Sequence, residues 1–229
     1  MRCGLFGKLT AKRDFIALFA PRAFLDAWEP WMQSGIAASR DLLGSAWQQA
    51  FLSAPIWRFW LGSDICGATV AGVFMPSVDG VGRYYPLTLF AYADPGIAIM
   101  PPDIDAQNDW FHAAEDYLLT TLDKDISFEQ TSSALDGFPA PPAVAAAAAS
   151  DPMVWIAEGT LAAHATDSTL PALFGKLRES NFASLYSGAS FWWTIGGGDY
   201  QPLALCCRRM PDPFLFASML TGRLEAKTN

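Results

Sequence analysis

Two apolar runs, at 72–75 and 84–90, form the clearest strand-like pattern in the sequence. Both are rich in β-branched and aromatic residues, and the segment between them contains Pro76, Gly80 and Gly82. Apolar runs separated by proline and an Asp-Gly pair are typical of two strands joined by a tight connection. We therefore expect this stretch to form the centre of a sheet.

The few polar side chains of this stretch fall at the connection, where Ser77, Asp79 and Arg83 occur, with Tyr84 directly after them. A connection on a rigid scaffold is a common place for recognition groups. Asp79 and Arg83 allow two interpretations: an ion pair that fastens the connection, or a contact point for a partner. The sequence leaves both open.

Further apolar runs predict strands along the rest of the chain. The predicted strands lie at 3–9, 56–61, 69–75, 153–157, 190–194 and 203–207. We interpret the residues from Lys12 to Phe15 as a loop, and 62–64 and 196–199 as turns, because glycine, serine and aspartate favour such positions.

Apolar residues at spacings of three and four predict the helices. They are expected at 21–44, from Ser45 to Pro55, and at 105–123, 127–135, 170–178 and 213–222, with Ser45 and Asp105 as N-caps. Pro30 should kink the first helix or divide it in two, since proline lacks the amide hydrogen that a helix interior uses.

Strands joined by hairpins, with helices before and after them, predict a mainly antiparallel sheet with helices on one or both faces. The fold class is therefore α/β, of the α+β type, in a single compact domain over 1–229. A Pro/Ala-rich connection at 137–152 separates a first half, 1–136, from a second half, 153–229. A doubly wound nucleotide-binding fold is disfavoured.

Charge narrows the possible partners. The chain carries 15 Lys and Arg against 23 Asp and Glu, and the resulting net charge of −8 repels phosphate backbones and acidic lipid surfaces. We therefore expect no binding to nucleic acid and no membrane insertion. No targeting segment or spanning helix is apparent, so a soluble, cytoplasmic protein is expected.

The sequence contains no complete catalytic or cofactor motif. The Gly-Lys pair at 7–8 lacks the spacing of a P-loop, no G-x-S-x-G elbow occurs, and His112 and His164 lie in unrelated segments. The acidic run at 103–125 lacks the spacing of a calcium loop, so a solvated helix face is expected there. We expect no catalytic residue, no cofactor, no metal ion and no enzyme activity.

Cysteines and tryptophans are interpreted as structural. Cys3, Cys66, Cys206 and Cys207 form no CxxC pair, and reduced, mostly buried thiols are expected. Trp192 and Trp193 are neighbours on a predicted strand and must point to opposite faces. One of them therefore leaves the main core face, to lie under a covering helix or in an apolar surface patch.

Several strings of residues occur together in an order that resembles a known family. They are GLFGKL at 4–9, RDF at 13–15, PRAFL at 21–25, APIWRF at 54–59, MPSVD at 75–79 and VGRYYPLT at 81–88. They resemble the TagF family of type VI secretion-associated proteins over about the first ninety residues. FWW at 191–193 and PDPFL at 211–215 resemble the C-terminal part of that family more weakly.

The resemblance implies a cytoplasmic, non-enzymatic regulator that represses the bacterial type VI secretion system after translation. In that family the repression is linked to the forkhead-associated scaffold protein of the system, which is therefore the expected partner. The family supplies no catalytic residues. The residues from 95 to 151 lie outside the strong part of the resemblance.

The candidate residues for partner binding or for fastening the loop are Ser77, Asp79, Arg83 and Tyr84, with Lys8, Arg13, Asp14 and Arg58 as secondary candidates. Two alternatives remain. The chain could be a structural or assembly subunit of the secretion apparatus. It could also be a hydrolase or transferase with a non-standard site around Lys8, Arg13, Asp14 and Asp79, which a raised carboxyl pKa in a deep pocket would support.

Overall fold

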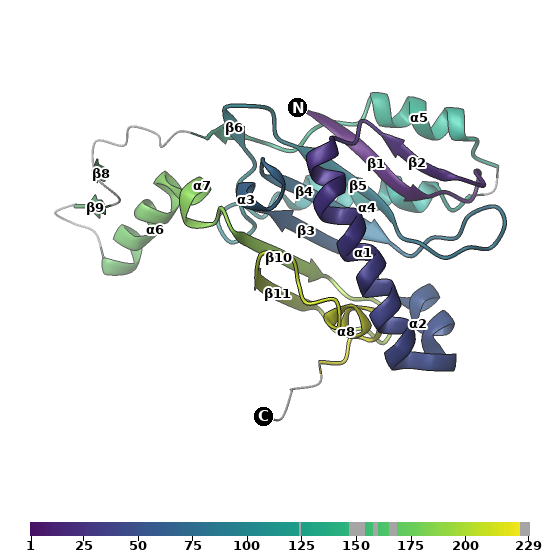
Figure 1. Ribbon diagram of the computed structural model, residues 1–229. Helices are drawn as coiled ribbons and strands as arrows, with labels where there is room; N and C mark the ends of the chain where they lie inside the picture. The colour runs from purple at the N-terminus through teal and green to yellow at the C-terminus, as the bar shows by residue number, and fades with distance from the viewer. Residues whose placement is uncertain (124, 147–153, 158–159, 165–168, 225–229) are drawn as a thin grey trace.

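The computed structural model describes residues 1–123, 125–146, 154–157, 160–164 and 169–224. Its centre is a seven-stranded sheet with the order β11-β10-β3-β4-β5-β1-β2, in which every neighbouring pair is antiparallel (Figure 1). The strands are β1 (Arg2–Lys8), β2 (Phe15–Leu18), β3 (Trp57–Leu61), β4 (Val70–Met75), β5 (Leu87–Tyr92), β10 (Ala189–Thr194) and β11 (Leu203–Arg208). The mainly antiparallel α+β fold expected from the sequence is confirmed.

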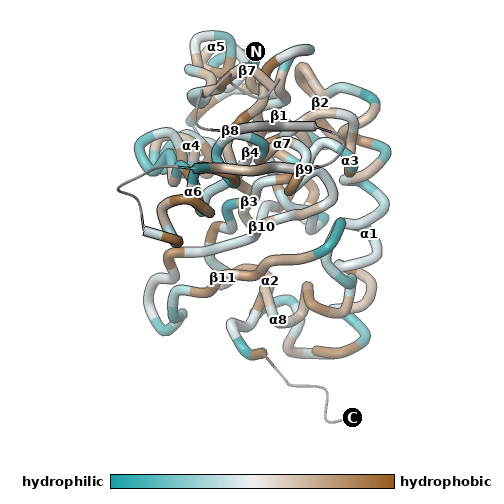
Figure 2. The backbone as a smooth tube through the Cα atoms, turned by 90° about the vertical axis from the view of Figure 1, so that its left-hand side faces the viewer, coloured by the Kyte–Doolittle hydropathy of each residue, from teal (hydrophilic) through white to brown (hydrophobic). Residues whose placement is uncertain are grey.

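Helices cover both faces of this sheet, so the structure has two hydrophobic cores. One face carries α1 (Arg22–Leu43), α2 (Trp47–Ser53) and α8 (Leu215–Thr221), and the other carries α4 (Asn108–Thr120) and α5 (Phe128–Asp136). Strands β2 and β11 lie at opposite edges of the sheet in two perpendicular views (Figures 1 and 2).

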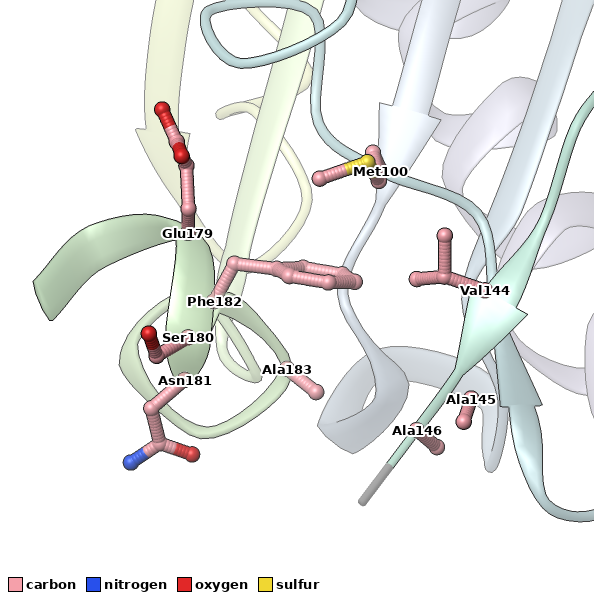
Figure 3. A pocket seen from close by; sticks show the side chains of 9 residues that line it. All are labelled: Met100, Val144, Ala145, Ala146, Glu179, Ser180, Asn181, Phe182 and Ala183. Carbon is pink, nitrogen blue, oxygen red and sulfur yellow. The ribbon is translucent and has the colours of Figure 1, made fainter. Parts of the chain in front are cut away.

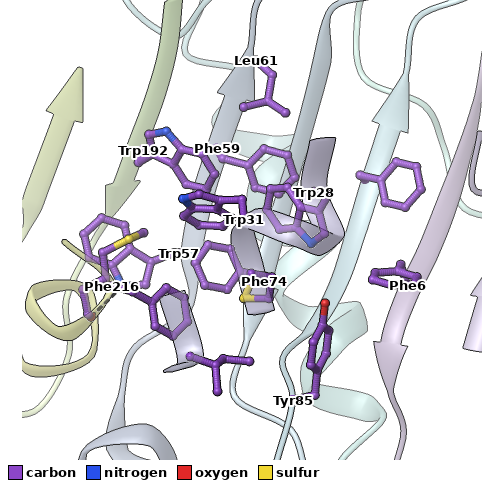
Figure 4. Close-up of a cluster of buried hydrophobic side chains, with 14 of the residues drawn as sticks. Phe6, Trp28, Trp31, Trp57, Phe59, Leu61, Phe74, Tyr85, Trp192 and Phe216 are labelled. Carbon is purple, nitrogen blue, oxygen red and sulfur yellow. Dashed lines mark hydrogen bonds between the residues drawn. The ribbon is translucent and has the colours of Figure 1, made fainter. Parts of the chain in front are cut away.

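The core under α1 is aromatic (Figure 4). Trp28 of α1 stacks on Trp192 of β10, with ring centroids 5.7 Å apart, and lies 4.4 Å from the ring of Phe59. Offset and tilted arrangements of this kind are favourable beyond the area that they bury. Trp193 points to the other face, as its position next to Trp192 requires, and its ring packs edge-on against Phe111 of α4 at 4.8 Å.

Short elements complete the fold. They are the 3-10 turn at Gly44–Ala46, α3 (Ser63–Cys66), α6 (Leu170–Ser180), α7 (Phe182–Leu185), a ribbon of β6 (Ile97–Ala98) with β7 (Val144–Ala145), and a hairpin of β8 (Val154–Ala157) with β9 (Thr160–Ala163). Met153 of the predicted strand and residues 147–152 of the Pro/Ala-rich connection lie outside the described residues. Among the described residues, no helix is both long and apolar enough to cross a membrane.

The structure corrects several expectations from the sequence. Phe15 belongs to strand β2, where it pairs with Lys8, and does not lie in a loop. Helix α1 is not divided at Pro30, because Trp28 and Trp31 on either side of it are buried against the sheet. Cys206 is exposed on the edge strand β11, so only some of the thiols are buried.

Some helix boundaries and caps also differ from those expected from the sequence. Helix α4 begins after Gln107, and Asp105 accepts hydrogen bonds from Gln107 instead of capping the helix. Leu122, which falls inside the helix expected at 105–123, lies beyond the end of α4 and is 48% exposed. No side chain caps α2, whereas Ser127 caps α5 together with Gln130 in a reciprocal capping box.

Candidate functional site

The connection between β4 and β5 packs against the loop that follows β1. Strand β1 ends at Lys8, β4 ends at Met75 and β5 begins at Leu87, so antiparallel pairing brings all three chain ends to the same end of the sheet. The amide of Gly80 donates to the carbonyl of Lys12 at 2.9 Å, and Ser77 Oγ donates to the carbonyl of Lys8 at 2.7 Å. The two loops therefore form one unit, which we call the loop pair (residues 8–14 and 76–86).

Asp79 is the centre of the loop pair. Its side chain is fully buried and accepts a hydrogen bond from Lys8 Nζ at 2.7 Å and another from Arg83 Nε at 2.7 Å. The other carboxylate oxygen accepts from the amides of Val81 at 3.1 Å and Arg83 at 2.9 Å. Groups of the protein itself therefore fill the capacity of this carboxylate to accept hydrogen bonds.

These contacts control the charge of Asp79. Burial alone would raise the pKa of its carboxyl, but the hydrogen bond from Lys8 and those from the amide and side chain of Arg83 and the amide of Val81 outweigh burial. The pKa of Asp79 is held well below its usual range, and the group stays ionised at all physiological pH values. A carboxylate in this state is a poor general acid.

The rest of the loop pair is fixed by its own backbone. The amide of Asp79 donates to the carbonyl of Arg83 at 3.1 Å, and that of Tyr85 donates to Ser77 at 3.0 Å. Gly82 has φ +85°, a value that favours glycine, and closes the turn. The tip that results exposes Val81, at 55%, and Arg83, whose side chain is 56% exposed.

The remaining candidate residues take different places. Arg13 and Asp14 are exposed, and the carbonyl of Arg13 accepts a hydrogen bond from Arg83 Nη2. Tyr84 is half-buried, with its ring edge-on to Trp47 at 5.6 Å, and its hydroxyl bonds to Gln48. These contacts join the loop pair to helix α2.

Arg58 does not belong to this site. It is buried on β3, under the opposite face of the sheet from α1, and binds both carboxylate oxygens of Glu115 of α4, at 2.6 and 2.8 Å. Glu115 was assigned to a solvated acidic face, which is wrong for this residue. The signal was present in the sequence, because Phe111, Glu115 and Leu118 follow the three-and-four spacing of a buried helix stripe.

Few side chains that could take part in a reaction line the cavity described next. A cavity of about 200 Å³ lies between β7 and helices α6 and α7, where Phe182 points between Met100 and Val144 (Figure 3). Among the described residues, Glu179 is the one ionisable side chain that lines it. Within the described part of the chain, no group of three His, Cys, Asp or Glu side chains could hold a metal ion.

Comparison with known proteins identifies the family. Residues 4–138 match the family model described as the TagF N-terminal domain, type VI secretion system-associated. The chain belongs to the TagF family. The match extends well past the first ninety residues and covers the TagF loop pair and Arg58.

A solved structure supports the same assignment. The chain is similar to PA0076 from Pseudomonas aeruginosa PAO1, with a TM-score of 0.80 and 31% identity over 98% of this chain and 96% of that chain. A search of curated proteins found no significant match. The family association with the type VI secretion system therefore applies to this chain, and the fold of PA0076 extends over nearly all of it.

Proposed function

We propose that this TagF-family chain is a cytoplasmic, non-enzymatic repressor of the type VI secretion system, which acts by binding a protein of that system. The observation that carries the proposal is its membership of a secretion-associated family. The forkhead-associated scaffold protein, to which TagF repression is linked, is the proposed partner.

The geometry of the loop pair supports binding in preference to catalysis. The buried carboxylate of Asp79 is held ionised by Lys8 and Arg83, so its pKa is lowered and not raised. The non-standard hydrolase or transferase site would require the opposite shift at this carboxyl. Lys8 and Asp79 are better explained as structural residues that hold the loop in place.

The exposed tip is suited to protein contact. Val81 and Arg83 project from a loop whose backbone is already fixed by hydrogen bonds, and the exposed Arg13 lies beside them. A preorganised loop loses little conformational entropy when it binds. Arginine is also enriched at protein interfaces. We therefore propose that the tip, formed by Val81, Arg83 and Arg13, contacts the partner.

Deletion of the gene in its own strain tests the function. A repressor predicts a rise in type VI secretion, which plasmid-borne wild-type protein should reverse. A loss of secretion would instead indicate a structural or assembly subunit. Unchanged secretion would contradict both.

Complementation with tip variants tests the surface. We expect Arg83→Glu and Val81→Asp to fail to restore repression and to lose capture of the forkhead-associated protein. Val81→Asp is the cleaner variant, because Arg83 also contacts Asp79. Arg208→Glu, an exposed arginine on the distant strand β11, is the matched control. Full repression by both folded tip variants would exclude this surface.

A further inference from the structure

Strand β2 forms a free edge of the sheet. It bonds to β1 on one side, and among the described residues no backbone group bonds to its other side. A free strand edge presents unpaired amide and carbonyl groups at which an extended peptide can add a further strand.

A hollow of about 310 Å³ runs along this edge. Each residue of β2, from Phe15 to Leu18, lines it, together with Lys12, Asp14 and Phe128 at the start of α5. A hollow beside a free edge can receive alternate side chains of an added strand, and such pockets give strand addition its specificity.

The side chains of β2 offer contacts on both faces of an added strand. Ile16 and Leu18 pack towards the core under α4 and α5, whereas Phe15 and Ala17 are exposed on the face of α1. Phe15 is 49% exposed although its ring already contacts Tyr85. A peptide with alternating apolar residues would therefore find apolar surface in both directions.

The charges beside β2 favour an acidic segment over a second copy of this chain as the occupant of the edge. Lys12 and Arg13 precede β2 and make no ion pair with a described residue, although Lys12 Nζ lies over the ring of Phe128 at 4.2 Å. Arg22 follows β2 and is 86% exposed, with Asp26 as its ion-pair partner at 2.8 Å. Of the residues that the structure describes, Asp14 is the one acidic side chain that lines the hollow. Antiparallel pairing of two copies of β2 would bring Lys12 and Arg13 of one copy towards Arg22 of the other, and such like charges repel. The edge is better matched by a segment with acidic ends.

We propose that the free edge of β2 binds an extended segment of a secretion-system protein, with an alternating apolar centre and acidic flanks, by strand addition. This inference rests on the proposed function for the identity of the partner. The added strand would lie next to the loop pair, because the carbonyl of Lys12, just before β2, accepts a hydrogen bond from the amide of Gly80.

A peptide probe tests the edge directly and without the partner. The probe is a fluorescent nine-residue peptide with alternating valine and threonine in its centre and two glutamates at each end. We expect it to bind at least about tenfold more tightly than the same peptide with lysine ends, and to weaken as salt is raised. Methylation of alternate backbone nitrogens should abolish binding, because strand addition depends on main-chain hydrogen bonds.

A pair of matched variants locates the binding. Ala17→Glu places a bulky anion on the exposed face of β2, and Ala204→Glu makes the same change on the exposed face of the other edge strand, β11. Because the added carboxylate repels the acidic peptide, we expect Ala17→Glu to weaken binding of the glutamate peptide by at least about tenfold and Ala204→Glu to leave that binding unchanged. Thermal unfolding of each variant checks that the fold is retained.

The possible outcomes separate this inference from the proposed function. Absence of peptide binding to the wild type, or equal binding to both variants, overturns strand addition at β2. Concentration-dependent dimers that Ala17→Glu abolishes would overturn it in favour of a second copy. If the gene deletion leaves secretion unchanged while the peptide binds at β2, the proposed function fails and the edge site stands.

Discussion

Asp79 holds the loop pair together, because one buried carboxylate accepts hydrogen bonds from Lys8, Val81 and Arg83. Replacing it with asparagine keeps the shape of the side chain but leaves the buried ammonium of Lys8 without a counter-charge. We expect Asp79→Asn to lower the free energy of unfolding by about 3–5 kcal/mol, as when other buried ion pairs are broken. Urea denaturation measures this directly.

The neighbouring Asp14 is the control for that variant. It is exposed and makes no ion pair with a described residue, so Asp14→Asn should change the unfolding free energy by less than about 0.5 kcal/mol. Equal effects of the two substitutions would contradict the central role of Asp79.

The lowered pKa of Asp79 also predicts a dependence of stability on pH. In the unfolded chain its carboxyl takes up a proton near its ordinary pKa of about 3.9, whereas in the folded protein it stays ionised to lower pH. The stabilising contribution is therefore complete above that value and is lost as the pH falls below it.

Comparison of two variants isolates this contribution. The unfolding free energy of the wild type should fall more steeply than that of Asp79→Asn as the pH is lowered below about 5. Parallel curves from pH 7 to acid would mean that Asp79 has the same proton affinity in both states.

Helix α4 is attached to the sheet by the pair of Glu115 with Arg58 of β3. Glu115→Ala leaves the buried guanidinium uncompensated, and we expect a cost of about 3–5 kcal/mol in unfolding free energy. The double change Arg58→Met with Glu115→Leu should recover most of that loss, since apolar residues of similar size avoid burying a charge. A double variant no more stable than Glu115→Ala would contradict this account.

Helices α1 and α8 meet at Gly35, where a Cβ would lie 2.9 Å from Cγ of Phe216. Glycine to alanine in a helix interior usually stabilises by up to about 1 kcal/mol. Here we expect Gly35→Ala to lower the unfolding free energy by about 1–3 kcal/mol instead, because the added methyl group overpacks the contact.

Gly175 of α6 is the matched control for this substitution. No described atom lies within 4 Å of a Cβ at that position, so Gly175→Ala should show the ordinary gain in stability. Thermal unfolding of the two variants should therefore shift in opposite directions.

Local patterns in the sequence predicted most of these elements but not all of their partners. Strands β3, β4, β5, β10 and β11 follow mainly apolar runs, and glycines 196–198 lie between β10 and β11 as expected. The turn expected at 62–64 is wrong, because helix α3 (Ser63–Cys66) begins there. Strand β2 is only four residues long and exists because it pairs with β1, a contact that its own residues do not encode. The two-residue ribbon of β6 with β7 has no periodicity to detect.

The same limit applies to the candidate site. The pairing of Asp79 with Arg83, four residues apart, was one of the two interpretations of the sequence. The contact of Asp79 with Lys8 joins residues 71 positions apart and depends on the order of strands in the sheet. The division of α1 at Pro30 was expected from the local rule alone, and the burial of Trp28 and Trp31 overrides that rule.

Across the whole molecule, the protection of backbone amides from hydrogen exchange should decrease from the middle of the sheet to its edges. Strands β3, β4 and β5 are interior and buried on both faces, whereas β2 and β11 are edges with exposed residues. We expect amide hydrogen exchange to be slowest in β3, β4 and β5 and at least about tenfold faster in β11. Exchange in β11 as slow as in β4 would mean that this edge is covered in solution.

The stacked indoles of the aromatic core have an optical consequence. Trp192 lies 5.7 Å from Trp28 and 4.6 Å from Trp31, so the transitions of these rings couple only while α1 lies on the sheet. Coupled indoles give an exciton couplet in circular dichroism. Trp192→Phe would remove the contribution of Trp192 and leave that of Trp28 with Trp31, whose rings lie 5.3 Å apart on the same helix. The difference between the two spectra isolates the couplet of Trp192. The amplitude of that couplet would report the docking of α1 separately from its helix content. The native tryptophans thus provide a spectroscopic signal for the detachment of helix α1 from the sheet.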